Sequence, residues 1–290
     1  MVELRDLSTP VQPSWILLMR NFFLGALTIL SVLLTYGGAG AATIYVPGSY
    51  ASIQAALDAA GADDTVIVKG DEYTENIVIR KPVTLISELG PAKTTVKAAV
   101  DGEPVIMIDG AKDVTLSGFT VTGSLVSGIL LSKASGAVVT NNRALNNGYG
   151  ITVLDSHSNT ITGNTSSFNS DYGIFLQRSN ENVVENNTAN SNRDKGFFIS
   201  YSNRNRIENN NANMNVWNGI TIWASNNNII KGNLTLRNAF GIVIEDSDGN
   251  ELINNTTLPN IFIILPIFLI YIGILTYGAQ KLILRLVYRS

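Results

Sequence analysis

The sequence contains no cysteine and a single histidine, His157. Disulfides, thiol catalysis and cysteine-based zinc clusters are therefore excluded, and cysteine usage says nothing about the compartment. Charged residues make up only 15% of the chain and the formal net charge is −3, so no basic field is available for a nucleic acid. An apolar content of 45% argues against disorder caused by charge.

The start of the chain has the layout of a secretory signal. Residues 19–43 contain one positive residue, Arg20, followed by an apolar run and then by small residues. The small residues at 39–41 form a cleavage motif. We expect residues 1–41 to be a signal peptide or an uncleaved signal anchor, with Met19 as an alternative start.

The end of the chain carries a second apolar run, residues 261–279, which contains no charge. At ~1.5 Å per helical residue it is long enough to cross a hydrocarbon core of ~30 Å. Lys281 and Arg285 follow it, and no basic residue lies between Arg237 and the run. The positive-inside rule then predicts a single-pass protein of the cell membrane, with a basic cytoplasmic tail at 280–290 and an extracytoplasmic main domain.

Between the two runs the sequence repeats with a period of 22 or 23 residues. A glycine precedes each apolar segment, at Gly128, Gly150, Gly173, Gly196, Gly219 and Gly241. Three Asn columns and one Ser column share the period: Asn159, Asn182, Asn205, Asn228 and Asn250; Asn142, Asn164, Asn187, Asn210, Asn233 and Asn255; Asn147, Asn169, Asn192, Asn215 and Asn238; Ser156, Ser179, Ser202, Ser225 and Ser247. Segments such as GITVL and GIFLQ alternate with period two, which is typical of half-buried strands.

Three short strands in each coil of 22–23 residues predict an all-β fold, a right-handed parallel β-helix over residues 43–258. We expect the column Asn residues to adopt the left-handed conformation at the corners and to hydrogen-bond the coils on either side. Residues 50–60 place Ile53, Ala56 and Leu57 on one helical face, which predicts a helix that caps the first coil.

The Asn columns and the stretch TIYVPGSYASIQAALDAAGADDTVIVKG resemble the right-handed parallel β-helix proteins of the NosD type, within the group of carbohydrate-binding and sugar-hydrolase repeats. The resemblance covers about residues 43–258 and implies a pectin lyase-like fold. The family name also implies copper, which favours His, Cys and Met ligands. With one His and no Cys, this property does not carry over. We interpret His157 as a turn residue and expect no cofactor.

Aromatic side chains are the main candidates for a binding site. The strand alternation places Phe175 and Phe198 on the outside of one sheet. An exposed aromatic stripe is typical of an interaction surface, and flat rings suit the faces of sugars. The alternatives to sugar binding are that the stripe binds a protein partner, or that the rings only pack against one another. The residues expected to bind a ligand are Phe175, Phe198, Trp223, Tyr172, Tyr201 and Trp217.

Two groups of carboxylates are further candidates. Glu185 and Glu208 lie in one outward column on adjacent coils, near the ~5–5.5 Å spacing of retaining glycosidases. Arg206 on the same face makes a surface charge ladder the alternative. The second group comprises Glu245, Asp246 and Asp248. These carboxylates are candidate ligands for a hard cation such as Ca²⁺, and the alternative interpretation is a solvated acidic edge.

These features favour a membrane-anchored cell-surface β-helix without catalytic activity. It would bind a polysaccharide or cell-envelope glycan, or have a structural role in the envelope. The first alternative is a polysaccharide-active hydrolase, lyase or epimerase. The second is an accessory subunit of a membrane transport complex, which requires a protein partner.

Overall fold

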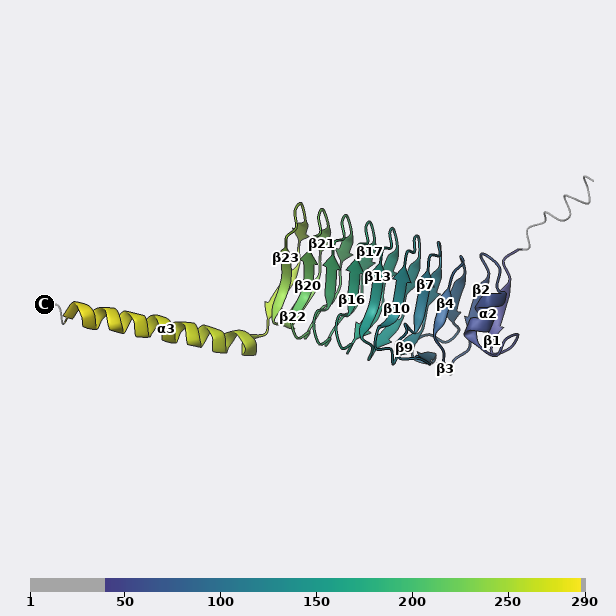
Figure 1. The fold of residues 1–290 in the computed structure, drawn as a ribbon, viewed down its shortest axis with the longest axis horizontal. Helices are drawn as coiled ribbons and strands as arrows, with labels where there is room; N and C mark the ends of the chain where they lie inside the picture. Colours follow the sequence, from purple (N-terminus) through teal and green to yellow (C-terminus); the bar gives the residue numbers. More distant parts are fainter. Residues whose placement is uncertain (1–39, 288–290) are drawn as a thin grey trace, which may run out of the picture. The chain divides into compact units, whose positions relative to one another are not determined.

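The computed structural model describes residues 40–287 of the chain. The predicted signal segment therefore lies outside the described residues as far as residue 39. The described part is a stack of coils whose strands pair in parallel with the coils before and after them (Figure 1). The predicted parallel β-helix is thus confirmed.

Three sheets, which we call A, B and C, run along the stack, and sheets A and C are continuous. Sheet A has ten strands: β1 (Thr43–Val46), β2 (Thr65–Val68), β5 (Thr84–Ser87), β8 (Thr115–Ser117), β11 (Val138–Thr140), β14 (Thr160–Thr162), β17 (Val183–Glu185), β19 (Arg206–Glu208), β21 (Ile229–Lys231) and β24 (Glu251–Ile253). Sheet C has eight: β4 (Ile77–Ile79), β7 (Ile106–Asp109), β10 (Ser127–Ser132), β13 (Tyr149–Leu154), β16 (Ile174–Gln177), β18 (Phe197–Ser200), β20 (Asn218–Trp223) and β23 (Phe240–Glu245).

The third sheet is interrupted, so the expected third strand is not formed in every coil. Sheet B consists of β3 (Glu72–Thr74), β6 (Thr95–Lys97), β9 (Thr120–Thr122), β12 (Arg143–Leu145) and β15 (Thr165–Ser167). Isolated parallel bridges at Thr188 and Asn211 continue it. They lead to the two-stranded pair β22 (Leu234–Asn238) and β25 (Thr256–Pro259).

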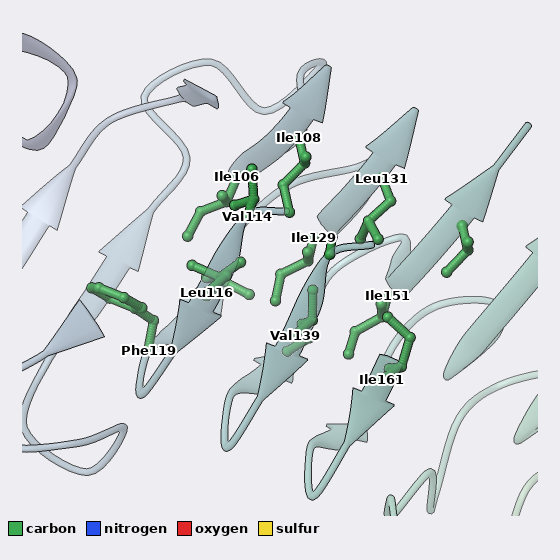
Figure 2. Close-up of a cluster of buried hydrophobic side chains, with 14 of the residues drawn as sticks. Ile106, Ile108, Val114, Leu116, Phe119, Ile129, Leu131, Val139, Ile151 and Ile161 are labelled. Atoms are coloured by element: carbon green, nitrogen blue, oxygen red, sulfur yellow. The ribbon is translucent and has the colours of Figure 1, made fainter. Parts of the chain in front are cut away.

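The core is a narrow apolar tube between the sheets. Alternate residues of each strand point inward, so that identical positions of successive coils stack on one another. In sheet C, Ile151 pairs in register with Ile129, which pairs with Ile106, and all three are fully buried. Figure 2 shows these side chains in contact with residues of sheet A, such as Leu116 and Val139. Phe119, which holds the column position of Asn142 one coil earlier, is also fully buried.

The Asn columns form buried hydrogen-bonded ladders. The Oδ1 of Asn187 accepts from the backbone N–H of Asn164 at 2.9 Å. Its Nδ2 donates to the carbonyl of Ile161 at 2.8 Å and to the Oδ1 of Asn210 at 3.1 Å. The same pattern recurs along all three columns, and the Ser column links successive coils in a similar way. These bonds pair backbone groups at the corners, where no sheet supplies a partner.

The left-handed conformation falls on a different residue from the one expected. It is adopted by the residue before each ladder position, such as Asn186 with φ 56° and Asn209 with φ 54°, and the ladder residues themselves are absent from this set. The reason is geometric. The left-handed residue turns the chain, and the next side chain then points inward along the stack, where it can reach the neighbouring coil.

A short helix covers the first coil, as predicted. Helix α2 (Ile53–Ala59) starts at Ser52, whose side chain accepts from the N–H of Ala55. The Glu75 carboxylate accepts from the first two helical N–H groups, those of Ile53 and Gln54, both at 2.9 Å. The apolar face of α2 is buried in the core.

The last coil has no such cover among the described residues. Leu252 of β24 and Leu258 of β25 are 51% and 61% exposed. Helix α3 (Ile261–Val287) follows Pro259 and includes the predicted helical segment. However, within residues 40–287 no helix has the length and apolar character required to cross a membrane. The structure therefore does not support the transmembrane assignment of residues 261–279.

Replacing a ladder residue should cost far more stability than replacing its neighbour. Asn187→Ala leaves the buried N–H of Asn164 and the carbonyl of Ile161 without their partner, and we expect a loss of about 3 kcal/mol in the free energy of unfolding. Urea titration of the full-length protein, followed by circular dichroism, measures this. Asn186→Gly is the control, because Asn186 is exposed and left-handed. Equal losses in both variants would contradict the ladder as the source of stability.

Candidate functional site

The outer face of sheet C is shaped by the repeat glycines. A Cβ at Gly173 would lie 2.7 Å from both the Cβ of Ala189 and the carbonyl oxygen of Gly196. This contact is too close for any side chain, so the chain must have Gly here. Ala189 is buried in the core, so the glycine position faces inward. The residue before each glycine faces outward instead, at the end of the turn from sheet B, and begins the outer face of sheet C. Tyr149 and Tyr172 occupy that position in successive coils.

Six aromatic side chains on this face form one contact network, which we call the aromatic row: Tyr149, Tyr172, Phe175, Phe198, Trp223 and Tyr201. Phe175 and Phe198 pair in register, with ring centroids 5.3 Å apart and planes at 6°. Tyr172 meets both rings edge-on, at 5.3 and 5.0 Å. Trp223 lies 6.5 Å from Phe198, and Tyr201 lies 4.9 Å from Trp223.

The structure brings five of the six predicted ligand-binding residues together and adds Tyr149. The sixth, Trp217, lies in the turn before sheet C, 56% exposed, without a ring contact among the described residues. The outward threonines Thr152 and Thr221 are only 7% and 4% exposed. Their strand neighbours Phe175 and Phe198 are larger and stand beside them in register.

Stacking decides what the row presents to solvent. Phe175 and Phe198 cover each other's faces, so their outward contribution is mainly ring edges. Tyr201, at the margin of the row, is 50% exposed. A ligand on this surface would therefore lie across ring edges and hydroxyl groups, and against the free faces at the ends of the row.

A polar cluster borders the row at the turn. Lys195 Nζ lies 2.8 Å from Asp194 Oδ1, and it sits 4.9 Å from the ring centroid of Tyr172 and 5.1 Å from that of Phe198. Asp171 holds the position of Asp194 one coil earlier. Burial raises the pKa of Asp171, and the negative charge of Asp194 adds to this effect. Burial likewise raises the pKa of Tyr149.

The sequence patterns did not point to Asp171, Asp194 and Lys195. A signal was present, because the coils of 23 residues have one extra turn residue before the glycine. In SDYG and RDKG that turn places an Asp at the same position of adjacent coils. Turn residues are easily dismissed as variable, yet loops held by a rigid scaffold often carry function.

Glu185 and Glu208 are neighbours in register on sheet A, as expected, and belong to a different sheet from the aromatic row. Arg206 lies 2.9 Å from Glu208, and its hydrogen bond lowers the pKa of that carboxyl group. A general acid needs the opposite shift. The ion pair favours the surface charge ladder, while a catalytic role of the two residues remains only a prediction.

The residues considered for metals have other contacts. Within the described residues, no group of three or more His, Cys, Asp or Glu side chains is placed to hold a metal ion. Asp246 Oδ2 accepts from Trp223 Nε1 at 3.3 Å, while Glu245 and Asp248 are exposed. His157 Nδ1 accepts from the backbone N–H of Asn180 at 3.0 Å, which fits a turn role. This donor set does not fit a copper site.

Comparison with protein families gives one match that covers most of the chain. The family model described as "NosD: Periplasmic copper-binding protein (NosD)" matches residues 63–262. No curated protein matches the sequence.

Solved structures share the fold at low sequence identity. An alginate lyase from Paenibacillus sp. str. FPU-7 is 14% identical with a TM-score of 0.53, and the match covers 75% of this chain and 97% of that one. The N-terminal fragment of bacteriophage Phi29 gene product 12 is 17% identical with a TM-score of 0.55, covering 62% and 38%. ORF18 of Geobacillus virus E2 is 13% identical with a TM-score of 0.55, covering 71% and 56%. At these identities the likeness shows the fold alone. The chain spans 38% of the Phi29 fragment and 56% of ORF18.

The two shifted carboxyl groups should affect stability in opposite directions. The pKa of Asp171 is raised on folding, so its contribution to stability is present at low pH and lost as pH rises through that pKa. The pKa of Glu208 is lowered, so its contribution is present at neutral pH and lost on acidification. We expect Asp171→Asn to raise the melting temperature at neutral pH and Glu208→Gln to lower it. Both differences should shrink in acid, and shifts of the same sign would contradict the assignment.

Proposed function

This chain belongs to the NosD family, and from that premise we propose that its β-helix is an extracytoplasmic module that binds a polysaccharide on the outer face of sheet C without cleaving it. The description of the family as periplasmic supports the location outside the cytoplasm. The aromatic row is the observation on which the proposal rests. Membrane attachment through residues 261–279 is not needed for it.

The repeat makes this face suitable for a polymer. Successive coils place equivalent side chains ~4.8 Å apart, so the row from Tyr149 to Trp223 is extended along the stack and offers several contact points to one chain. Amphipathic rings with hydroxyl groups bind sugars through stacking and hydrogen bonds together. The fold itself is compatible with carbohydrate, because one structural neighbour is an alginate lyase.

Copper forms no part of the proposal. The family description names it, but the described residues have no cluster of ligands, and the Nδ1 of His157 already accepts a hydrogen bond from the backbone.

An enzyme acting on polysaccharide is the second candidate. Asp171 and Asp194 lie on adjacent coils beside Lys195, and burial raises the pKa of Asp171, as it does for many general acids. The cluster lies beside the aromatic row, so a sugar bound there could reach it. An accessory role with a protein partner is the third candidate, and it would use the open last coil, where Leu252 and Leu258 are exposed.

Removing two rings should abolish most of the binding. We expect the double variant Phe198→Ala, Trp223→Ala to lose about 2 kcal/mol, or roughly 30-fold in affinity, for any polysaccharide the protein retains. Affinity electrophoresis of the full-length protein on a panel of neutral and acidic polysaccharides measures this. Tyr45→Ala is the control, because Tyr45 is 43% exposed on sheet A, away from the row. Retention unchanged in the double variant would exclude the row as the binding surface.

Product release separates binding from catalysis. Incubation with the same panel should produce neither new reducing ends nor unsaturated products. If products appear, their loss in Asp171→Asn would place the reaction at the aromatic row, whereas loss in Glu185→Gln or Glu208→Gln would place it on sheet A. Either outcome would replace the non-catalytic proposal with the enzymatic one.

A further inference from the structure

The aromatic row already holds one ammonium group, that of Lys195. Its Nζ lies 2.8 Å from the Asp194 carboxylate and about equally far from the ring centroids of Tyr172 and Phe198, at 4.9 and 5.1 Å. A carboxylate on one side and aromatic rings on the other are the two elements that bind an amine cation in proteins. The site therefore shows, with one of its own side chains, which kind of charge it stabilises.

The preceding coil repeats the carboxylate but not the lysine, because the side chain of Tyr172 fills the position that Lys195 holds. Asp171 occupies the turn position of Asp194, one coil earlier, next to the rings of Tyr149 and Tyr172, which are 5.4 Å apart. Where Asp194 is followed by Lys195, Asp171 is followed by Tyr172. In the described part of the chain, Asp171 has no ion-pair partner within 4.0 Å, and burial raises its pKa. The Tyr149 hydroxyl donates a hydrogen bond to Asp171 and Lys195 lies close enough to favour its charge, but neither forms an ion pair with it, so an ammonium that reaches Asp171 from solvent would gain one.

The charges around the row point to the same ligand. Asp155 at its far margin is paired with Arg178 at 2.7 Å and is neutralised. Glu245 and Asp246 lie beside Trp223 without an ion pair among the described residues, so they add to the negative charge. The chain as a whole has a net charge of −3. A polyuronate, with a carboxylate on each residue, would be repelled by these unpaired carboxylates.

We propose that the polysaccharide bound by the aromatic row carries free amino groups, as in a polymer of glucosamine, and that one ammonium binds the Asp171 carboxylate at the margin of the row, beside Tyr149 and Tyr172. This inference rests on the function proposed above and narrows it to one class of sugar. The ammonium would pair with Asp171 as the ammonium of Lys195 pairs with Asp194. A glycan that lacks the positive charge loses this contact and keeps only stacking and neutral hydrogen bonds.

The test compares glucosamine oligomers with N-acetylglucosamine oligomers and oligouronates of the same length. Isothermal titration calorimetry on the full-length protein measures the affinities at a pH where both the amines and Asp171 are ionised. We expect the amine form to bind about tenfold more tightly than the acetylated form, since a partly desolvated charge-assisted contact contributes ~1.4 kcal/mol. The oligouronate should not bind measurably.

Asp171→Asn keeps the shape of the side chain and removes its charge, so it should reduce the ratio of the two affinities from about ten to about one. Glu72→Gln is the matched control, because it removes one carboxylate from an exposed ion pair on sheet B. A lysine oligomer of equal charge tests for general attraction to polycations and should bind more weakly than the amino sugar.

The outcomes separate this inference from the proposed function. Equal binding of amine and acetylated oligomers, both lost in the Phe198→Ala, Trp223→Ala variant, would overturn the amino-sugar inference and leave the binding module intact. An equal loss in Asp171→Asn and Glu72→Gln, or equal binding of the lysine oligomer, would also overturn it, because the attraction would then be non-specific. Absence of binding to every oligomer and polysaccharide would overturn both.

Discussion

The hydrogen-bonded Asn ladders are the constraint on which this structure depends. A β-helix bends its backbone several times in each coil, and each bend leaves buried N–H and C=O groups that the sheets cannot pair. An Asn amide has both an acceptor and a donor, so Asn164 and Asn187 can connect consecutive coils and satisfy those groups at the same time. A buried N–H without a partner costs ~1–3 kcal/mol, which explains why the same residue type recurs at each corner.

The ladders also fix the register between coils, and that register creates the candidate site. When every coil is held one strand spacing above the last, side chains in the same column become neighbours wherever they occur in the sequence. Tyr149, Phe175, Phe198 and Trp223 come from separate coils, yet they form a continuous row. Variation is confined to the turn before the repeat glycine, which has room for an additional residue. Asp171 and Asp194 occur in this turn, so the polar residues beside the aromatic row can vary while the stacked strands stay in register.

On the proposal made above, charge determines which class of sugar the aromatic row prefers. Ring stacking alone would accept many sugars, because it depends on shape and apolar area. The carboxylates at the margin favour cations and disfavour polyanions, and Lys195 shows that an ammonium fits between a carboxylate and two rings. At 14% identity the alginate lyase shares the fold alone, so its substrate does not carry over to this chain.

The sequence by itself determined the coil period, the three strands, the Asn and Ser columns and the capping helix. It could do so because a one-dimensional repeat relates each residue to the same position one coil away, which spacing alone reveals. Only the tertiary structure decided contacts between different columns. It placed the left-handed conformation before the ladder residue and joined Tyr149 to the row. It also brought Lys195 onto the rings of Tyr172 and Phe198. Such contacts depend on the path of the turn and on side-chain direction, and neither has a period that the sequence displays.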